Sequence, residues 1–162
     1  MTKPILAELA LAAGRVVMDV YAQDFSVRLK SEDSPVTEAD VRAEALILEG
    51  LARAYPGVPV VAEESFAAKG ATEIGGRFLL VDPLDGTKEF IRKTGEFTVN
   101  IALIENGVPV EGSVYAPARG DLYWTEGGAA YHASGATPDF ADFASGRRLR
   151  VAPVEATPRA AI

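Results

Sequence analysis

The sequence contains no cysteine and a single histidine, His132, among its 162 residues. Without cysteine, the chain has no disulfide, no thiolate nucleophile and no zinc site built on cysteine. One histidine also excludes histidine-rich metal sites and disfavours a Ser-His-Asp catalytic triad. Carboxylates are therefore the side chains that remain to carry chemistry.

Long apolar runs are also missing. The most apolar stretch lies near the N-terminus and is interrupted by Glu8, Arg15 and Asp19, so no segment spans the hydrocarbon core of a bilayer. The opening residues MTKP do not begin an export signal, because no basic stretch, apolar stretch and cleavage site follow in order. We therefore expect a soluble cytoplasmic protein without a transmembrane segment.

Positive charge is scarce, because 23 acidic residues oppose 16 basic ones and give a formal net charge of −7. A surface that binds a nucleic-acid polymer needs clustered Lys and Arg, so this function is disfavoured. A phosphorylated small molecule could still bind if a divalent cation reversed the local sign of an acidic site.

The length and the 48% hydrophobic content suit one folded domain, which we assign to residues 1–152. The Pro- and Ala-rich residues 153–162 are predicted to be a frayed tail or a linker.

Helical periodicity marks two segments before residue 58. Residues 4–24 are predicted to form a helix whose core face is Ile5, Leu9, Ala12, Val16 and Val20. The second helix is predicted to start at Thr37, where Asp40 completes a capping box, and to end at the YPG of residues 55–57. Its expected buried stripe is Val41, Ala45, Leu48 and Ala52. The residues 30–35 between the helices are expected to form a loop.

After Gly57 the pattern changes to strands. Residues 58–64 and 77–82 are short apolar runs that end in acids, and Asn106-Gly107 predicts an antiparallel hairpin. A second hairpin is expected to turn at Gly127-Gly128, and residues 147–152 form a plausible last strand. Helices followed by strands predict an α+β fold, with two N-terminal helices packed on a largely antiparallel sheet.

Acidic residues gather where these elements end or begin. Glu63 and Glu64 follow one strand, Asp82 and Asp85 follow another, and Asp40 opens a helix. Neighbouring strand ends lie a few ångströms apart, so acids at two such ends can share a cation. In the sequence DPLDGT, Pro83 and Gly86 would curl the chain so that both Asp side chains and the Leu84 carbonyl face one point, with hard oxygens that suit Mg²⁺.

The segment GTKEF could then open a helix whose N–H groups hold a phosphate oxygen. Ordinary structure explains the same residues one at a time. Asp before Pro or Gly is common in turns, Asp85 could cap the following helix, and Asp40 is accounted for by the capping box. Acid pairs such as Glu63-Glu64 usually lie on solvated loops. The residues alone leave both interpretations open, and their combination favours a site.

Four segments together resemble the magnesium-dependent, lithium-sensitive phosphatase superfamily of inositol monophosphatase. They are SPVTEAD (34–40), VAEES (61–65), VDPLDGTKEFI (81–91) and GEFTVNIAL (95–103). The KEFI and GEFTVNIAL segments are most similar to the 3'(2'),5'-bisphosphate nucleotidases of sulfate assimilation. The resemblance extends from the first helix to about residue 152.

This resemblance implies a role for each matching residue. The metal ligands would be Glu63, the bridging Asp82, the carbonyl of Leu84, and Asp85. The substrate site would comprise Glu63, Leu84, Asp85, Gly86 and Thr87, with Gly86 and Thr87 contacting the phosphate. Asp40 and Thr87 would orient and deprotonate the attacking water beside Glu63, and Glu64 would support the ligands from behind. Two Mg²⁺ ions would activate the water and stabilise the leaving oxygen.

The implied function is a Mg²⁺-dependent phosphomonoesterase that removes the 3'-phosphate of adenosine 3',5'-bisphosphate. One alternative is an inositol or sugar monophosphatase. Another is a non-catalytic fragment or subunit that assembles through its sheet, for example as a homodimer.

Family members have a second, C-terminal α/β half, which completes a layered αβαβα fold and supplies a further metal-binding Asp and most substrate contacts. Nothing after Gly146 matches that half. We therefore expect weak Mg²⁺ binding and little turnover from this chain alone, and the missing half leaves the substrate open.

Overall fold

The computed structural model describes residues 4–23, 27–29, 35–65, 75–137, 139 and 142–151, with only the backbone described at residues 27–29 and 35. The tail predicted at residues 153–162, and most of the loop predicted at residues 30–35, lie outside these residues. Among the residues that are described, no helix is long and apolar enough to cross a membrane.

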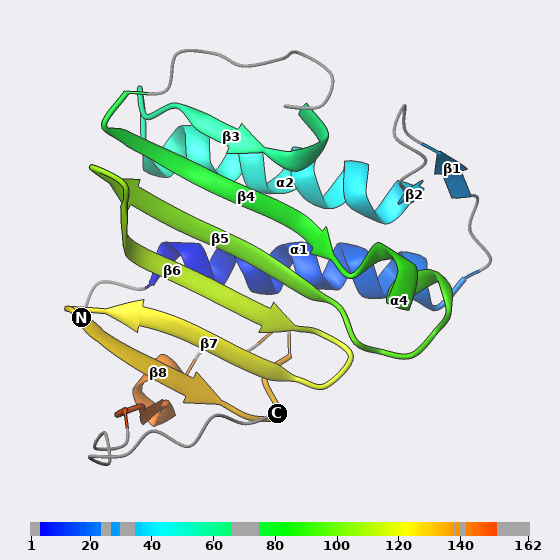
Figure 1. Cartoon of the computed structure of the whole chain (residues 1–162). Helices are drawn as coiled ribbons and strands as arrows, with labels where there is room; N and C mark the ends of the chain where they lie inside the picture. Colours follow the sequence, from blue (N-terminus) through cyan, green and yellow to red (C-terminus); the bar gives the residue numbers. More distant parts are fainter. Residues whose placement is uncertain are drawn as a thin grey trace, which may run out of the picture.

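A seven-stranded sheet forms the centre of the molecule (Figure 1). Its strands, in spatial order, are β3 (Val60–Ala62), β4 (Arg77–Asp85), β5 (Thr98–Glu105), β6 (Val108–Ala116), β7 (Asp121–Glu126), β8 (Ala129–Ala133) and β9 (Arg147–Arg148). Only the β3–β4 pair is parallel, and the other pairs are antiparallel. A separate two-stranded sheet pairs β1 (Val27–Leu29) with β2 (Pro35–Thr37).

Helices α1 (Ile5–Tyr21) and α2 (Glu38–Ala54) run side by side and cover one face of the sheet (Figure 1). The short helix α4 (Thr87–Ile91) follows β4, and the 3₁₀ turn η1 (Phe143–Ser145) precedes β9. The core lies between the helices and the sheet, and includes Val17, Ile47, Leu79 and Tyr115. The predicted α+β class, with two N-terminal helices on a largely antiparallel sheet, is confirmed.

The predicted core faces of the two helices were wrong by about one residue. In α1, Val20 is buried, but Ile5 is exposed, and the helix packs through Leu6, Ala10, Ala13 and Val17 among others. The helix approaches the sheet closely, because a Cβ added at Gly14 would overlap the ring of Tyr115. Small residues therefore determine which face of α1 is buried.

In α2 the predicted stripe is exposed or half-buried, and Val41 has 56% of its surface exposed. The buried residues are Ala39, Asp40, Ala43, Glu44, Ile47, Gly50 and Leu51. Two acids thus take places on the buried face that a purely hydrophobic pattern cannot assign.

Both predicted hairpins are present. Asn106 and Gly107 have φ of 51° and 79°, and Gly127 and Gly128 have φ of 57° and 74°. Positive φ at both central residues is the signature of the type I′ turn, whose twist matches that of paired strands. The last strand, β9, contains only Arg147 and Arg148 and is shorter than the predicted span of 147–152.

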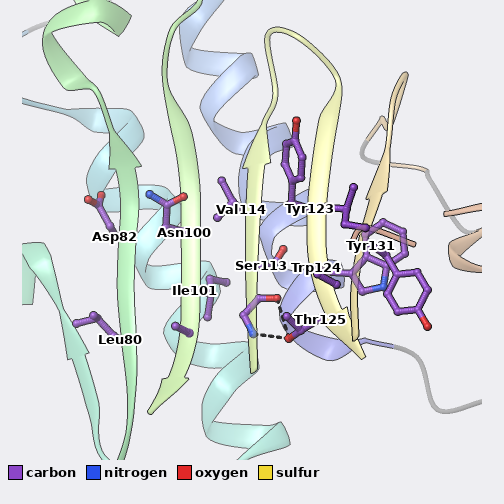
Figure 2. A pocket seen from close by; sticks show the side chains of 14 residues that line it. Leu80, Asp82, Asn100, Ile101, Ser113, Val114, Tyr123, Trp124, Thr125 and Tyr131 are labelled. Atoms are coloured by element: carbon purple, nitrogen blue, oxygen red, sulfur yellow. Dashed lines mark hydrogen bonds between the residues drawn. The ribbon is translucent and has the colours of Figure 1, made fainter. Parts of the chain in front are cut away.

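The sheet face opposite α1 and α2 is open in the described part of the chain (Figure 1). In register across β4 to β7, Asp82 lies beside Asn100, Asn100 beside Val114, and Val114 beside Tyr123, so all four belong to this face. Figure 2 shows this row from close by, and it borders a shallow depression of about 440 Å³. Most of the side chains that line the depression are apolar, and the acidic residue Asp82 also belongs to its lining.

Candidate active site

Two strand ends bring acids together. In the parallel β3–β4 pair, Ala62 is the partner of Val81. The next residues, Glu63 and Asp82, therefore come directly after the paired segment, at the same level along the two strands. Residues 63–65 begin a helical turn, whereas β4 continues to Asp85. The geometry therefore places acids that are 19 positions apart in the sequence at one edge of the site.

The DPLDG segment breaks the regular ladder between β4 and β5. The register shifts between Asp82 and Asp85, and the Leu84 N–H donates to Asp82 Oδ1 over 3.2 Å. Gly86 has a φ of 95°, and a Cβ there would lie 2.7 Å from the carbonyl oxygen of Glu96. Only glycine fits this turn without strain, so Gly86 sets the direction in which the chain leaves Asp85 for α4.

The Asp82 carboxyl is affected by its acidic neighbours. Burial, the negative charges of Glu63 and Asp85, and a hydrogen bond with Glu63 together raise the pKa of Asp82 from 3.8 to about 7. Glu63 and Asp85 are therefore both close enough to Asp82 to repel its carboxylate. Glu63 and Asp85 are exposed and Asp82 is half-buried, and Asp85 Oδ2 accepts a hydrogen bond from Asn100 Nδ2 over 3.2 Å.

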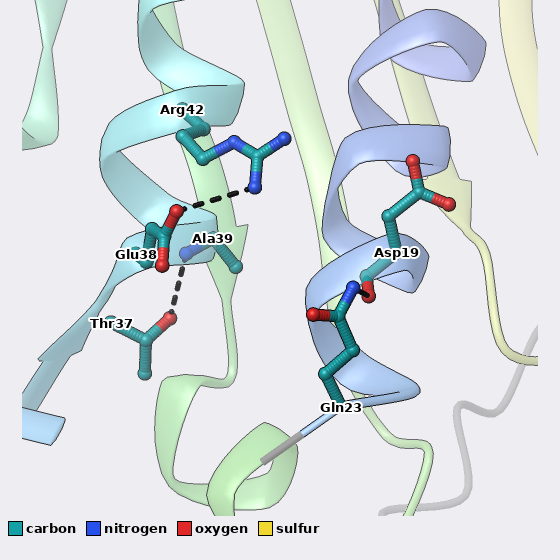
Figure 3. Close-up of polar contacts among 6 residues, drawn as sticks. All are labelled: Asp19, Gln23, Thr37, Glu38, Ala39 and Arg42. Carbon is teal, nitrogen blue, oxygen red and sulfur yellow. Dashed lines mark hydrogen bonds and ion pairs between the residues drawn. The ribbon is translucent and has the colours of Figure 1, made fainter. Parts of the chain in front are cut away.

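Asp40 connects α2 to the DPLDGT turn. Its side chain is 1% exposed, and its Oδ2 accepts hydrogen bonds from the Thr37 N–H over 2.7 Å and the Thr37 hydroxyl over 2.6 Å. Figure 3 shows the other half of the predicted capping box, in which the Thr37 hydroxyl accepts from the Ala39 N–H. Burial raises the pKa of Asp40, while the hydrogen bonds from Thr37 and Thr87 oppose that shift.

The second oxygen of Asp40 faces Thr87. The Thr87 hydroxyl lies 3.2 Å from Asp40 Oδ1 and 3.2 Å from the Leu84 carbonyl oxygen, and its one proton can be donated to either. Asp40 is thus a helix cap and also a partner of Thr87. The capping interpretation was correct, but it does not account for the contact with Thr87.

Two polar residues near the site were not predicted. Glu44, one turn after Asp40 on α2, accepts hydrogen bonds from the Glu64 N–H over 2.9 Å and from the Ser65 hydroxyl. Asn100 is the β5 neighbour of Asp82 and holds Asp85. The i, i+4 spacing of Asp40 and Glu44 was a signal for a shared helix face, but an acid is rarely expected on a buried stripe.

The donor chemistry of the site fits Mg²⁺. A hydrogen bond between Asp82 and Glu63 needs a proton between two carboxyl groups, and a divalent ion can replace that proton. The Leu84 carbonyl adds a third hard oxygen. As the described side chains stand, however, no group of three or more His, Cys, Asp or Glu residues is arranged to hold an ion. The described acids therefore match the ligand type that Mg²⁺ prefers.

Comparison with known proteins identifies the family of this chain. The sequence profile of the Inositol monophosphatase family matches residues 2–158. The chain is 49% identical over 128 residues to the 3'(2'),5'-bisphosphate nucleotidase CysQ of Salmonella typhimurium, covering 78% of this chain and 52% of that protein. It is 45% identical over 128 residues to CysQ of Escherichia coli K12, again covering 52% of the relative. The chain spans about half the length of these curated relatives.

Solved structures show the same likeness. CysQ from Bacteroides thetaiotaomicron, described as a bacterial member of the inositol monophosphatase family, superimposes with a TM-score of 0.71 at 34% identity. The match covers 93% of this chain and 58% of that one. An IMPase from Thermotoga maritima gives a TM-score of 0.71 at 28% identity, over 91% of this chain and 52% of that one. With its fold, its acidic strand ends and its sequence in agreement, the chain belongs to the inositol monophosphatase family.

Proposed function

We propose that this chain is the metal-site part of a Mg²⁺-dependent phosphomonoesterase of the CysQ type, acting on the 3'-phosphate of adenosine 3',5'-bisphosphate. The observation that carries the proposal is the cluster of Glu63, Asp82 and Asp85, in which burial and the charges of Glu63 and Asp85 raise the pKa of Asp82 to about 7. Groups with strongly shifted pKa values are enriched at functional sites. The similarity to CysQ proteins supports the choice of substrate class.

Glu63, Asp82, Asp85 and the Leu84 carbonyl would hold the ions. Bound Mg²⁺ would offset the negative charge of the carboxylates and stabilise charge on the phosphate and leaving oxygens. Gly86 and Thr87 would lie against the phosphate, and Glu64 would support the ligands from behind. Because α4 has only five residues, these contacts would come from individual groups and not from a helix macrodipole.

Asp40 and Thr87 would handle the proton of the attacking water. The buried Asp40 carboxylate accepts the Thr87 hydroxyl hydrogen, which leaves the lone pairs of Thr87 Oγ1 available to accept from water. As the water attacks phosphorus, its proton would pass to Thr87 while the Thr87 proton moves to Asp40. The raised pKa of Asp40 makes its carboxylate a stronger base for this step.

We also propose that residues 1–152 fold as one unit in the cytoplasm, followed by a tail or linker at 153–162. A non-catalytic role, in which this chain assembles with another through its sheet, is the second candidate. The observation in its favour is the open sheet face, on which Leu80, Val114 and Tyr123 are each more than two-fifths exposed. An inositol or sugar monophosphatase is the third candidate, and it uses the same acids.

Phosphate release from a panel of esters tests the proposal. We expect release from adenosine 3',5'-bisphosphate to exceed that from inositol 1-phosphate, to require Mg²⁺ and to fall on addition of Li⁺. Turnover should be low, because the chain covers only about half of its relatives. Asp85→Asn should abolish release and leave assembly unchanged. Mg²⁺-independent release, or full activity in Asp85→Asn, would contradict the proposal.

A further inference from the structure

Helix α2 points two buried acids at the sheet. Asp40 is 1% exposed and Glu44 is 5% exposed. They are four residues apart, so they lie one above the other on the same helix face. A buried carboxylate is costly unless it is hydrogen-bonded, which makes the partners of each acid informative.

Both oxygens of Glu44 are used, and both partners follow β3. Glu44 Oε2 accepts from the Glu64 N–H over 2.9 Å, and Oε1 accepts from the Ser65 hydroxyl. The Glu64 N–H belongs to the first turn of the helical segment at residues 63–65, where helix N–H groups lack intrahelical partners. These two hydrogen bonds therefore connect the turn to α2, although Glu44 lies 20 positions before Glu64 in the sequence.

The two acids hold the two halves of the site from one rigid element. Asp40 contacts Thr87, beyond the end of β4, and Glu44 contacts the turn that carries Glu63, beyond the end of β3. The separation of Glu63 from Asp82 thus depends on α2 as well as on the short pairing of β3 with β4.

We propose that Glu44 is a positioning residue, which acts through the Glu64 N–H and the Ser65 hydroxyl to hold Glu63 beside Asp82. This inference rests on the proposed function. Residues that orient metal ligands from outside the ligand set typically affect metal affinity about 10- to 100-fold. A Glu44 that served only to satisfy its own burial would change stability and leave the affinity of correctly folded protein unchanged.

The test compares Glu44→Ala with Glu44→Gln and with Glu49→Ala. Gln can accept from the Glu64 N–H and donate to the Ser65 hydroxyl, so it keeps both contacts and removes only the charge. Glu49 lies on the exposed side of the same helix, in an ion pair with Arg53, and is the matched control. Amide hydrogen exchange at Glu64 is measured in metal-free protein, and Mg²⁺ affinity is measured by titration of the residue 63 and 82 amide signals.

We expect Glu44→Ala to speed Glu64 exchange about tenfold relative to the β4 amides. It should also weaken Mg²⁺ binding at least about tenfold. Glu44→Gln and Glu49→Ala should remain near wild type in both measurements. If Glu44→Ala does not fold, Ser65→Ala replaces it, because it removes one of the two contacts at an accessible turn.

Unchanged exchange and affinity in folded Glu44→Ala would overturn the inference, and so would a loss in Glu44→Gln equal to that in Glu44→Ala. If the proposed function itself is wrong, the measurements give a different result. In that case wild type would bind no Mg²⁺, or would bind it equally well after Asp82→Asn. The exchange rates of the metal-free protein would then decide separately whether Glu44 holds the turn.

Discussion

At the scale of single residues, Asp82 couples stability to pH. Its pKa rises to about 7 in the folded protein, from an ordinary value of 3.8, so folding favours its protonated form. A raised folded-state pKa contributes stability below the unfolded-state value, and that contribution is lost as the pH rises through the folded-state value. The same proton competes with any cation for Glu63 and Asp82.

Metal-free protein should therefore lose stability as the pH rises from about 4 to about 7, by about 1–2 kcal/mol once solvent screening is allowed for. Asp82→Asn should remove this part of the pH dependence, and Mg²⁺ should restore stability most strongly at the alkaline end. Thermal unfolding across this range, with EDTA or with Mg²⁺, measures both effects. An unchanged pH slope in Asp82→Asn would refute the assignment to this residue.

Thr87→Val preserves shape and removes the hydroxyl beside Asp40. Because Asp40 Oδ1 then loses a hydrogen bond in a buried position, we expect unfolding to become easier by about 1–3 kcal/mol. Phosphate release should fall by about 100-fold or more, because the path for the water proton is interrupted. Thr87→Ser should retain both properties, and Thr94→Val, at an exposed position, is the control. Equal activity in the Val and Ser variants would exclude Thr87 from proton transfer.

At the scale of elements, the parts with strong local signals were predictable. The Asn106-Gly107 turn and the Thr37 capping box were read correctly because short-range backbone chemistry determines them. The buried face of α2 was not, because Asp40 and Glu44 are buried through contacts with distant residues. The parallel β3–β4 pairing could not be predicted from the sequence either, because pairing between separate segments leaves no local pattern. Asp40, Glu63, Asp82 and Asp85 could be proposed as site residues from their type and their place at the ends of elements, whereas Glu44 and Asn100 required the fold.

We expect that Gly86, in the turn between β4 and α4, cannot be replaced by a residue with a side chain without loss of stability. Gly86→Ala combines a positive φ with a Cβ only 2.7 Å from a backbone oxygen, so we expect a loss of about 2–4 kcal/mol in unfolding free energy. Gly107→Ala also has a positive φ, but nothing lies within 4 Å of its Cβ, so its cost should be about 1 kcal/mol. Urea midpoints measure the difference. Equal costs at the two positions would show that the close approach at Gly86 is unimportant.

At the scale of the whole molecule, α1 and α2 cover one sheet face, and no described helix or strand covers the other (Figure 1). On this face Leu80, Val114 and Tyr123 are exposed large hydrophobic residues, and contiguous apolar patches can mark interaction sites or aggregation-prone regions. The chain alone should self-associate at high concentration, and Val114→Lys should shift it towards monomer. Val41→Lys, on the outer side of α2, is the matched control. Light scattering after size exclusion measures the mass, and a monomer at every concentration would contradict this expectation.

The position of β3 affects the order in which parts of the sheet unfold. This strand has three residues, lies at the end of the strand order and, among the described strands, pairs with β4 alone. Short peripheral strands fray at a lower free energy than central ones. Glu63 is thus carried by one of the least anchored parts of the sheet and Asp82 by a far longer strand. Gentle denaturation should separate them while the hairpins stay intact, so any cation bound between these two acids would be released before the sheet unfolds.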